Sequence, residues 1–369
     1  MALAFALAAV ALYFVTIGSS DDGTDTVTTQ ATVAASAPER APQAAARRFL
    51  DTYVKPDGRV ERTDQGGDTV GEGQAYGMLL AAAIGDQRRF DLIWTWTKDN
   101  LRGADGLIAF LWRDGEVVDP KPASDADVDA GRALLAASCR FKRPELEDEA
   151  LTLSRAILRN ETVRFRDLPL LVAGPWARKP TVIFNPSYFS PATFAALAKS
   201  TGENRWNSLS GSSRRVVARL MPREGTLPPD WGVVRGGKPV ASGPPDDLGG
   251  KAQFGFDAVR TLVRFAEDPD PAGRKLAARA WPAFEGRRPE DIPVEWDPSG
   301  KPAGGTEHPT ALVAAAAAAK AAGDDASESE LLDAAEALDR RRPTYFGSAW
   351  VALGRLMLDT NELNCPQGG

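Results

Sequence analysis

Helical segments that are apolar on every face alternate along this sequence with helical segments that carry charge on one face. Apolar spacing, capping residues and helix breakers together predict about twelve helices. They span residues 41–54, 72–85, 87–101, 125–139, 143–159, 188–200, 203–221, 252–267, 269–282, 306–322, 325–340 and 344–359. The helices form successive pairs, and the second helix of each pair is the more apolar, most plainly at residues 312–319.

A helix that is apolar all round belongs in a core, whereas a helix with one polar face belongs at the surface. The pairs therefore predict an all-α fold in which an inner ring of helices lies within an outer ring, an (α/α)6 barrel. An incomplete ring would leave inner helices unburied, so we expect one domain over residues 41–362. Residues 107–112 and 116–118 flank Asp114-Gly115 and predict a small β-hairpin.

The N-terminal segment differs in composition from the rest of the chain. Residues 2–17 are apolar and uncharged, which suits a signal peptide and is short for a membrane span. Residues 18–40 are rich in Ser, Thr, Ala and Asp and predict a disordered linker. We expect a periplasmic or secreted protein in which residues 1–17 are either cleaved or contact the inner membrane as an anchor. The alternative is an artefactual start on a cytoplasmic protein.

The composition argues against several classes of function. The net charge of −6 comes from interspersed acids and bases without a basic stripe, so nucleic acid is not expected as a partner. A single histidine, His308, removes most metal sites and leaves little scope for a Ser-His-Asp triad, and no metal or cofactor is expected. The two cysteines, Cys139 and Cys365, lie far apart and would pair only in an oxidising compartment.

Six residues with polar or ionisable groups fall at or near the starts of the predicted inner helices. They are Glu72, Asp125, Tyr188, Asp257, His308 and Tyr345. Since inner and outer helices alternate, the inner helices run parallel to one another and their starts meet at one end of the barrel. The sequence therefore predicts a cleft at that end, lined with carboxylates and aromatic rings.

Two of these acids have surroundings that would make them behave differently. Glu72 lies between Gly71 and Gly73 at the entrance of an apolar helix, where an acid either interacts with the helix dipole or acts in catalysis. Asp257 precedes Arg260 by three positions, which forms either an ordinary ion pair or a pair that keeps a general base ionised. Two carboxyls in unlike environments provide the acid and base that glycoside hydrolysis needs.

Three further acids stand at alternate positions, Asp125, Asp127 and Asp129. A calcium loop is excluded, because Ala130 stands where glycine is required and Ala136 where the final acid is required. One of the acids, or the preceding serine, could be a helix N-cap. We expect Asp125 to point into the cleft, supported by Asp127 or Asp129.

The nine Trp residues are the unusual part of the composition, and flat indoles suit the apolar faces of sugar rings, although most Trp residues are simply core. Trp94 and Trp96 lie within a predicted helix and are expected in the core. Trp112 and Trp231 lie in loop-like contexts and are predicted to stack on sugars. The predicted substrate-binding residues are Trp112, Tyr188, Arg260, Trp231 and Tyr345.

Four stretches in order along the chain resemble glycoside hydrolase family 8. They are residues 72–78, 123–141, 185–188 and 256–260. The similarity runs from about residue 45 to about residue 360 and is greatest to the periplasmic endoglucanases that accompany bacterial cellulose synthases. Gly71 stands where the family usually has Ser, and Ala130-Gly131 replaces a bulkier residue and Ala, but neither departure touches a carboxylate.

The resemblance implies an (α/α)6 barrel and inverting hydrolysis of β-1,4-glucan, with cellulose or cello-oligosaccharides as substrate. It implies Glu72 as general acid, Asp257 as general base and Asp125 as a ligand of the distorted sugar, with Tyr188 and Arg260 holding the water and the base. In an inverting site the acid and base lie about 6.5–9.5 Å apart. Association with a cellulose synthase is a further implication.

Three alternatives remain open at this stage. The same fold acts on xylan or chitosan in related enzymes. A non-catalytic glycan-binding scaffold would keep the cleft without needing a matched acid and base. A lyase would need a Tyr, His or Arg base at an acidic sugar, a role for which His308 with Tyr345 gives little support, and the acidic charge of the chain disfavours an anionic polymer.

Overall fold

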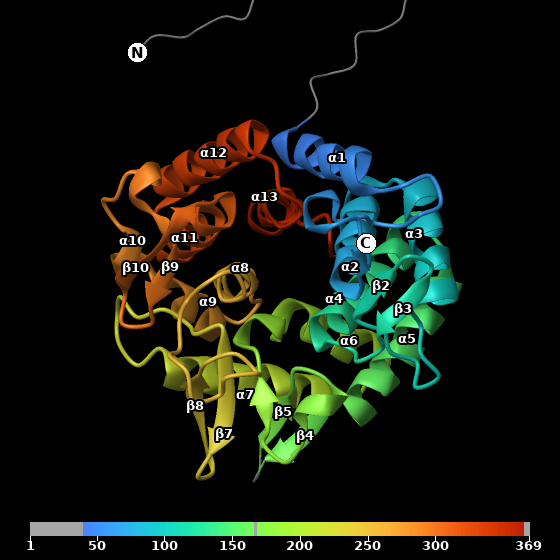
Figure 1. Ribbon diagram of the computed structural model, residues 1–369, viewed down its shortest axis with the longest axis horizontal. Helices are drawn as coiled ribbons and strands as arrows, with labels where there is room; N and C mark the ends of the chain where they lie inside the picture. The colour runs from blue at the N-terminus through green and yellow to red at the C-terminus, as the bar shows by residue number, and fades with distance from the viewer. Residues whose placement is uncertain (1–39, 166–167, 365–369) are drawn as a thin grey trace, which may run out of the picture. The chain divides into compact units, whose positions relative to one another are not determined.

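A computed structural model of the protein describes residues 40–165 and 168–364, and the helices of this part form two concentric rings (Figure 1). The inner helices are α2 (Gly71–Ile84), α4 (Ser124–Phe141), α6 (Pro191–Thr201), α8 (Val259–Ala266), α11 (Pro309–Ala322) and α13 (Tyr345–Asp359). The outer helices are α1 (Ala41–Tyr53), α3 (Gln87–Asn100), α5 (Pro144–Asn160), α7 (Arg205–Leu220), α9 (Pro271–Ala278) and α12 (Asp325–Arg341). A short helix, α10 (Trp281–Phe284), follows α9. The predicted (α/α)6 barrel is confirmed.

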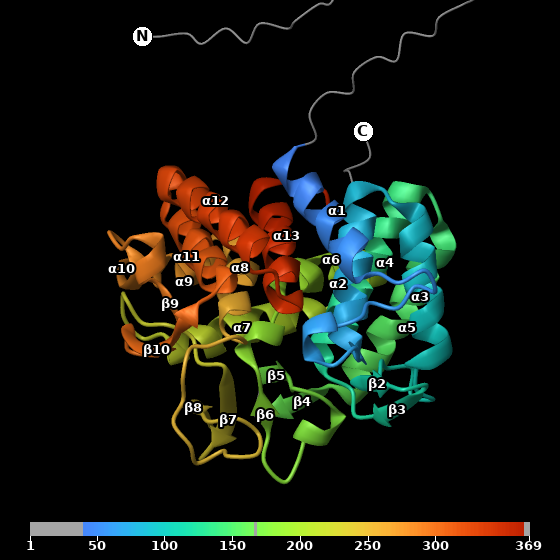
Figure 2. The same cartoon turned by 45° about the horizontal axis from the view of Figure 1, so that its top comes forward.

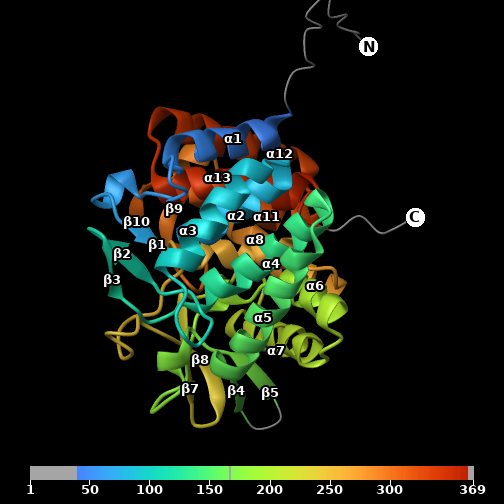
Figure 3. The ribbon, with the colours of Figure 1, turned by 90° about the vertical axis from the view of Figure 1, so that its right-hand side faces the viewer.

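The inner ring forms because its helices are buried on all sides, and most of the charged residues of α4 and α8 are buried in pairs. In α11 every residue from Pro309 to Ala319 is buried. The outer helix α5, in contrast, buries mainly the stripe that contains Leu146, Ala150 and Leu153. Alanine and glycine let inner helices approach closely: a Cβ added at Gly354 of α13 would lie 2.5 Å from Cγ1 of Val313 in α11. Figure 3 shows the outer helices α3 and α5 lying over α2 and α4.

Small antiparallel sheets gather at one end of the helical rings (Figure 2). Their strands are β1 (Thr69–Val70), β2 (Leu111–Arg113) and β3 (Glu116–Asp119); β4 (Thr162–Phe165) and β5 (Leu168–Leu171); β6 (Ile183–Phe184), β7 (Trp231–Arg235) and β8 (Lys238–Ser242); and β9 (Pro293–Asp297) and β10 (Lys301–Glu307). The predicted hairpin is confirmed as β2 and β3. The other strands were not predicted, because β6 is only two residues long and β10 is exposed almost throughout, without alternation.

Several inner helices start later than the sequence pattern predicts, as α8 and α6 illustrate. The predicted helix 252–267 begins only at Val259, since Phe254 instead exchanges two backbone hydrogen bonds of 2.9 Å with Trp296. The predicted helix 188–200 begins at Pro191, after a 3-10 turn at Pro186–Tyr188. Both changes leave the residue of interest, Asp257 or Tyr188, in the connection that precedes an inner helix.

Three ion pairs cross the barrel interior between α4 and α8. Arg260 donates to Asp125 at 2.7 Å, Arg264 forms two 2.7 Å bonds to Asp129, and Arg132 forms bonds of 2.6 and 2.8 Å to Glu267. Along each helix the paired residues are three or four positions apart, so the three ion pairs lie on one face of each helix. Because burying charges offsets most of their attraction, these pairs chiefly fix how the two helices face each other.

Within residues 40–165 and 168–364, no helix has both the length and the apolar character needed to cross a membrane. The predicted signal peptide or anchor at residues 1–17 lies outside the described residues, as does nearly all of the predicted linker. Cys139 lies in α4, and Cys365, its predicted partner in an oxidising compartment, is also outside the described part of the chain.

Candidate active site

The residues predicted to converge do stand at the starts of the inner helices. Glu72 lies in the first turn of α2, Asp125 in the first turn of α4, Tyr188 in the 3-10 turn before α6, Asp257 two residues before α8, His308 at the N-cap of α11 and Tyr345 at the first position of α13. This part of the sequence prediction is confirmed. The fold thus brings ionisable groups that lie at or just before the starts of the six inner helices to one end of the barrel.

Arg260 connects the three acids that were predicted to be catalytic. Its Nη1 donates hydrogen bonds to Oδ2 of Asp125 at 2.7 Å, to the hydroxyl of Tyr76 at 3.1 Å and to Oε2 of Glu72 at 3.3 Å. Its Nη2 donates to Oδ1 of Asp257. The Arg260 side chain is 1% exposed, so one buried cation orients two carboxyl groups from the helices α2 and α4 and a third from the connection before α8.

Glu72 has the environment of a general acid. Burial raises its pKa to about 7; Arg260 opposes this shift, while the charges of Asp125 and Asp257 add to it. The hydroxyl of Tyr76 donates to Oε2 of Glu72 at 3.3 Å. A carboxyl with a pKa near neutrality is protonated in a large fraction of molecules and can still release its proton readily.

Asp257 and Asp125 differ from Glu72 and from each other in exposure. The Asp257 side chain is the most open of the three, at 30% exposed, against 19% for Glu72 and 3% for Asp125. Burial raises the pKa of Asp125, and its ion pair with Arg260 opposes that shift. An exposed carboxyl oriented by a cation can accept a proton from water, whereas the enclosed Asp125 is better placed to hold a substrate hydroxyl.

A cleft of about 460 Å³ opens beside Glu72 and Asp257. It is lined by Arg62, Asp64, Gln65, Glu72, Phe256, Asp257, His308, Thr344, Tyr345 and Phe346. Of these, Arg62, Asp64, Gln65, Phe256, Thr344 and Phe346 were not predicted as site residues from the sequence. Phe256 is 44% exposed, and Arg62 lies over the ring of Tyr345 with 6.0 Å between its Cζ and the ring centroid.

The predicted sugar-binding aromatics fall into separate groups. Tyr188 packs against Arg260, whose Cζ is 5.2 Å from the ring centroid, and lies edge-on to Trp231 with centroids 6.2 Å apart. Trp112 instead belongs to the sheet of β1, β2 and β3, where the guanidinium of Arg59 lies 5.0 Å from its ring centroid. Tyr345 lines the cleft but is only 1% exposed. Trp94 and Trp96 are buried, as expected of core residues.

His308 makes no metal site in the structure. Its Nδ1 lies 2.8 Å from the hydroxyl of Thr310 and its Nε2 lies 3.2 Å from the hydroxyl of Thr344. Burial lowers its pKa to about 4, so the imidazole is neutral at ordinary pH and ties the starts of α11 and α13 together. Among residues 40–165 and 168–364, no cluster of three or more His, Cys, Asp or Glu side chains could hold a metal ion.

The two acids expected to support Asp125 have other partners. Asp129 pairs with Arg264, one helical turn further along α4 and α8 than the pair of Asp125 with Arg260. Asp127 accepts the backbone N–H of Ile108 at 3.0 Å through Oδ1. Its Oδ2 and both carboxyl oxygens of the buried Glu161 have no donor among the described residues, and the two carboxyls interact with each other. Burial raises the pKa of both Asp127 and Glu161 well above the ordinary values, and for Glu161 the charge of Asp127 adds to the shift. Two adjacent carboxyls without a cation are expected to share a proton.

Because Asp127 and Glu161 share a proton, we expect their contribution to the free energy of unfolding to fall as pH rises. Since the folded state binds protons that the unfolded state has released, stability is highest below about pH 4 for this pair and declines by up to about 1.4 kcal/mol per pH unit above that. Glu161→Gln can donate an amide N–H to Asp127 and should flatten the decline. Urea midpoints at about pH 5 and about pH 9 test this, with Glu145→Gln, at the exposed start of α5, as control. Equal pH slopes in wild type and Glu161→Gln would contradict the shared proton.

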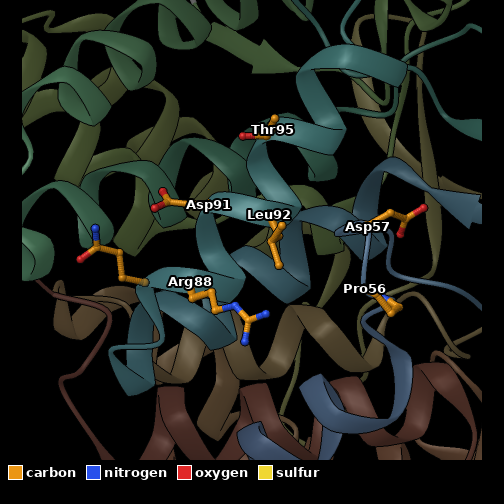
Figure 4. A pocket seen from close by; sticks show the side chains of 7 residues that line it. Pro56, Asp57, Arg88, Asp91, Leu92 and Thr95 are labelled. Carbon is orange, nitrogen blue, oxygen red and sulfur yellow. The ribbon is translucent and has the colours of Figure 1, made fainter.

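A second hollow, of about 700 Å³, lies on the outside of the barrel beside α3. Figure 4 shows Pro56, Asp57, Arg88, Asp91, Leu92 and Thr95 around it. None of its lining residues comes from an inner helix, and none belongs to the cluster around Arg260. The hollow is larger than the cleft but does not have the pair of carboxyls in unlike environments that the cleft contains.

A helical barrel with two carboxyls of unlike environment beside an open cleft has the architecture of a glycoside hydrolase. The chain belongs to glycosyl hydrolases family 8, whose family model matches residues 22–357.

Individual relatives agree with this assignment. The chain is 32% identical over 238 residues to a probable endoglucanase of Novacetimonas hansenii, covering 61% of this chain and 68% of the relative. It is 31% identical over 253 residues to an endoglucanase of Cellulomonas uda, covering 65% and 67%. Among solved structures, the endo-beta-1,4-glucanase CMCax from Acetobacter xylinum superposes with a TM-score of 0.72 at 28% identity, over 86% of this chain and 98% of that one.

Proposed function

We propose that this chain is an endo-β-1,4-glucanase that hydrolyses internal bonds of cellulose or cello-oligosaccharides with inversion, and that residues 41–362 are its catalytic domain. The observation that carries the proposal is the cluster around Arg260, which orients Glu72, with its pKa of about 7, and the more exposed Asp257 beside one cleft. The similarity to proteins named endoglucanases supports the choice of glucan.

In the proposed mechanism Glu72 donates its proton to the glycosidic oxygen as the bond to the anomeric carbon breaks. Asp257 removes a proton from a water molecule, which attacks the anomeric carbon from the opposite face of the ring. One bond forms as the other breaks, so the product has the inverted configuration. Nη1 of Arg260, 3.3 Å from Oε2 of Glu72, is placed to stabilise the carboxylate that Glu72 leaves behind.

Asp125 is proposed to bind the sugar at the point of cleavage. It lies 2.7 Å from the same Nη1 atom that contacts Glu72, so it faces the reacting centre, yet it is too enclosed to admit water freely. Tyr188 and Arg260 are proposed to hold the water and the base. Trp112 and Trp231, which are partly exposed outside the lining of the cleft, are proposed to bind sugar rings through their flat apolar faces. The prediction that Tyr345 binds a sugar ring is not kept, because its ring is enclosed by Phe49, Tyr53 and Arg62.

Export from the cytoplasm is part of the proposal. It is supported by the uncharged apolar stretch at residues 2–17 and by the Ser/Thr/Ala/Asp-rich residues 18–40. Residues 1–17 then act as a signal peptide or as an inner-membrane anchor. A role in cellulose synthesis beside a synthase is proposed from the resemblance to endoglucanases of that setting.

Matched soluble polymers test the proposed substrate. The full chain should hydrolyse carboxymethylcellulose faster than xylan or chitosan of similar length, and viscosity should fall early because internal cuts shorten chains before many reducing ends accumulate. Faster hydrolysis of xylan or chitosan would contradict the choice of glucan. Binding of all three polymers without hydrolysis would favour the scaffold alternative over an enzyme.

A further inference from the structure

Asp230 is a buried acid next to the proposed active site that the mechanism above does not use. It immediately precedes β7, and its side chain is almost fully enclosed, at 7% exposed. The sequence pattern drew attention only to its neighbour Trp231. An enclosed carboxyl has to be satisfied by hydrogen bonds, and its partners therefore show what it does.

All the hydrogen bonds recorded for Asp230 go to the segment that carries Asp257. Its Oδ1 accepts the backbone N–H of Gly255 at 2.9 Å and the backbone N–H of Ala258 at 2.7 Å. Its Oδ2 accepts from Nε2 of Gln253 at 3.3 Å, and its own N–H donates to the carbonyl of Gln253 at 2.7 Å. The two backbone N–H groups held by Oδ1 lie on either side of Asp257, so its backbone is fixed from both directions.

The close approach of Asp230 to this segment depends on a glycine. A Cβ added at Gly255 would lie 2.6 Å from Oδ2 of Asp230, a separation that real Cβ atoms do not adopt. Any larger residue at this position would push the carboxyl away from the segment or push the segment away from the carboxyl. Gly255 and Asp230 thus form one unit of local structure.

Asp230 also holds the residue at which α8 starts, while the first N–H groups of the helix, those of Val259, Arg260 and Thr261, already bond to backbone carbonyls. The N-cap residue of α8, Ala258, has no side chain that can accept a hydrogen bond from the first turn. The carboxyl of Asp230 accepts the Ala258 N–H from outside the helix, where an anion interacts favourably with the helix dipole. Since Arg260 lies in the first turn of α8, the same contact fixes the base and the cation that orients it.

We infer that Asp230 is a positioning residue, whose carboxyl clamps the backbone around Asp257 and sets the direction of the base relative to the attacking water. The inference rests on the proposed function, in which Asp257 is the base. A displacement of about 1 Å at a reacting group can lower the rate by about a hundredfold without weakening substrate binding.

The pKa of Asp230 agrees with its position close to Asp257 and the backbone around it. Burial raises its pKa to about 7, the charge of Asp257 adds to the shift, and the N–H groups of Ala258 and Gly255 and the Gln253 side chain oppose it. Asn at position 230 removes the charge but keeps an oxygen for the two N–H groups. Comparing Ala with Asn therefore separates loss of the clamp from loss of the charge.

The test compares Asp230→Ala, Asp230→Asn and Gly255→Ala in the full chain acting on cellohexaose. We expect Asp230→Ala and Gly255→Ala to lower kcat by about a hundredfold while KM changes by less than about threefold. Asp230→Asn should stay within about tenfold of the wild-type kcat, because its side-chain oxygen still accepts both N–H groups. Asp324→Ala, which removes the N-cap of the outer helix α12, is the control for loss of a helix-capping carboxyl and should leave kcat unchanged.

A second substrate separates a role at the base from general damage to the site. An aryl cellotrioside with a dinitrophenolate leaving group needs no proton from Glu72, but it still needs the water that Asp257 activates. Asp230→Ala should therefore remain slow on this substrate as well. Recovery of its rate to the wild-type level would overturn the inference.

The outcomes distinguish this inference from the proposed function. Absence of hydrolysis by the wild type would overturn both. Hydrolysis by the wild type with an unchanged kcat in Asp230→Ala and Gly255→Ala would overturn the positioning role alone. If Asp230→Ala does not fold, as judged by circular dichroism, Gly255→Ala decides. A loss of about a hundredfold in Asp230→Asn together with a wild-type kcat in Gly255→Ala would assign the effect to charge and contradict the clamp.

Discussion

Glu72→Gln is expected to lower kcat on cello-oligosaccharides by about a thousandfold while leaving KM nearly unchanged. Glutamine has almost the same shape as protonated glutamate and keeps an oxygen for Tyr76 and Arg260, so the site should retain its geometry. What the variant loses is the proton that the leaving glycosidic oxygen must receive. Steady-state kinetics on cellohexaose, with binding measured separately by calorimetry, provides the measurement.

The activated aryl substrate makes this prediction specific to a general acid. Because dinitrophenolate leaves without protonation, Glu72→Gln should hydrolyse it within about tenfold of the wild-type rate. Glu145→Gln, at the start of the outer helix α5, is the matched control and should behave as wild type on both substrates. Retained turnover of cellohexaose by Glu72→Gln would remove Glu72 from the acid role, whatever the aryl substrate showed.

Arg260→Met is expected to have the second large effect, on both activity and stability. The variant leaves Glu72, Asp125 and Asp257 near one another without their cation, and breaking a buried ion pair from one side costs about 3–5 kcal/mol. We expect kcat to fall by at least about a thousandfold, since both the acid and the base lose their orientation. Urea unfolding and steady-state kinetics measure the two effects.

The pH dependence of the stability that Arg260→Met loses identifies the cause of that loss. As the pH falls below about 7, the pKa of Glu72, this carboxyl becomes protonated and the repulsion decreases, and the raised pKa of Asp125 acts in the same direction. The stability deficit of Arg260→Met should therefore shrink towards acidic pH and grow towards alkaline pH. Arg260→Lys keeps the charge but not the forked set of donors, so it should recover stability more than activity. Arg288→Met, on an exposed arginine that also pairs with acids, is the control. A deficit that did not change with pH would mean that lost packing, and not uncompensated charge, explains the effect.

The barrel and the placement of the site residues could be predicted because both depend on local pattern. Apolar residues on every face marked helices such as α11 as inner ones, and parallel inner helices bring their starts to one end. Glu72 and His308 could therefore be placed before any contact was known. The helix ends were less predictable, since α8 starts at Val259 only because Phe254 pairs with Trp296 far along the chain.

The contacts that tune the site could not be predicted, because each joins residues distant in sequence. Arg260 was expected to pair with Asp257, three positions away, but it also reaches Glu72 and Asp125 from two other helices. Asp127 was expected to support Asp125, yet it faces Glu161, which no helical or strand spacing relates to it. Asp230 gave no sequence signal apart from its position before Trp231.

The stereochemistry of cellohexaose hydrolysis tests the central claim, that Glu72 and Asp257 act as acid and base on β-1,4-glucan with inversion. In a proton NMR time course with the full chain, the α-anomer of the new reducing ends should appear first and then mutarotate. Early β-anomer would show retention, which needs carboxyls about 5 Å apart and a nucleophile in place of a base, and would contradict the assignment of Asp257.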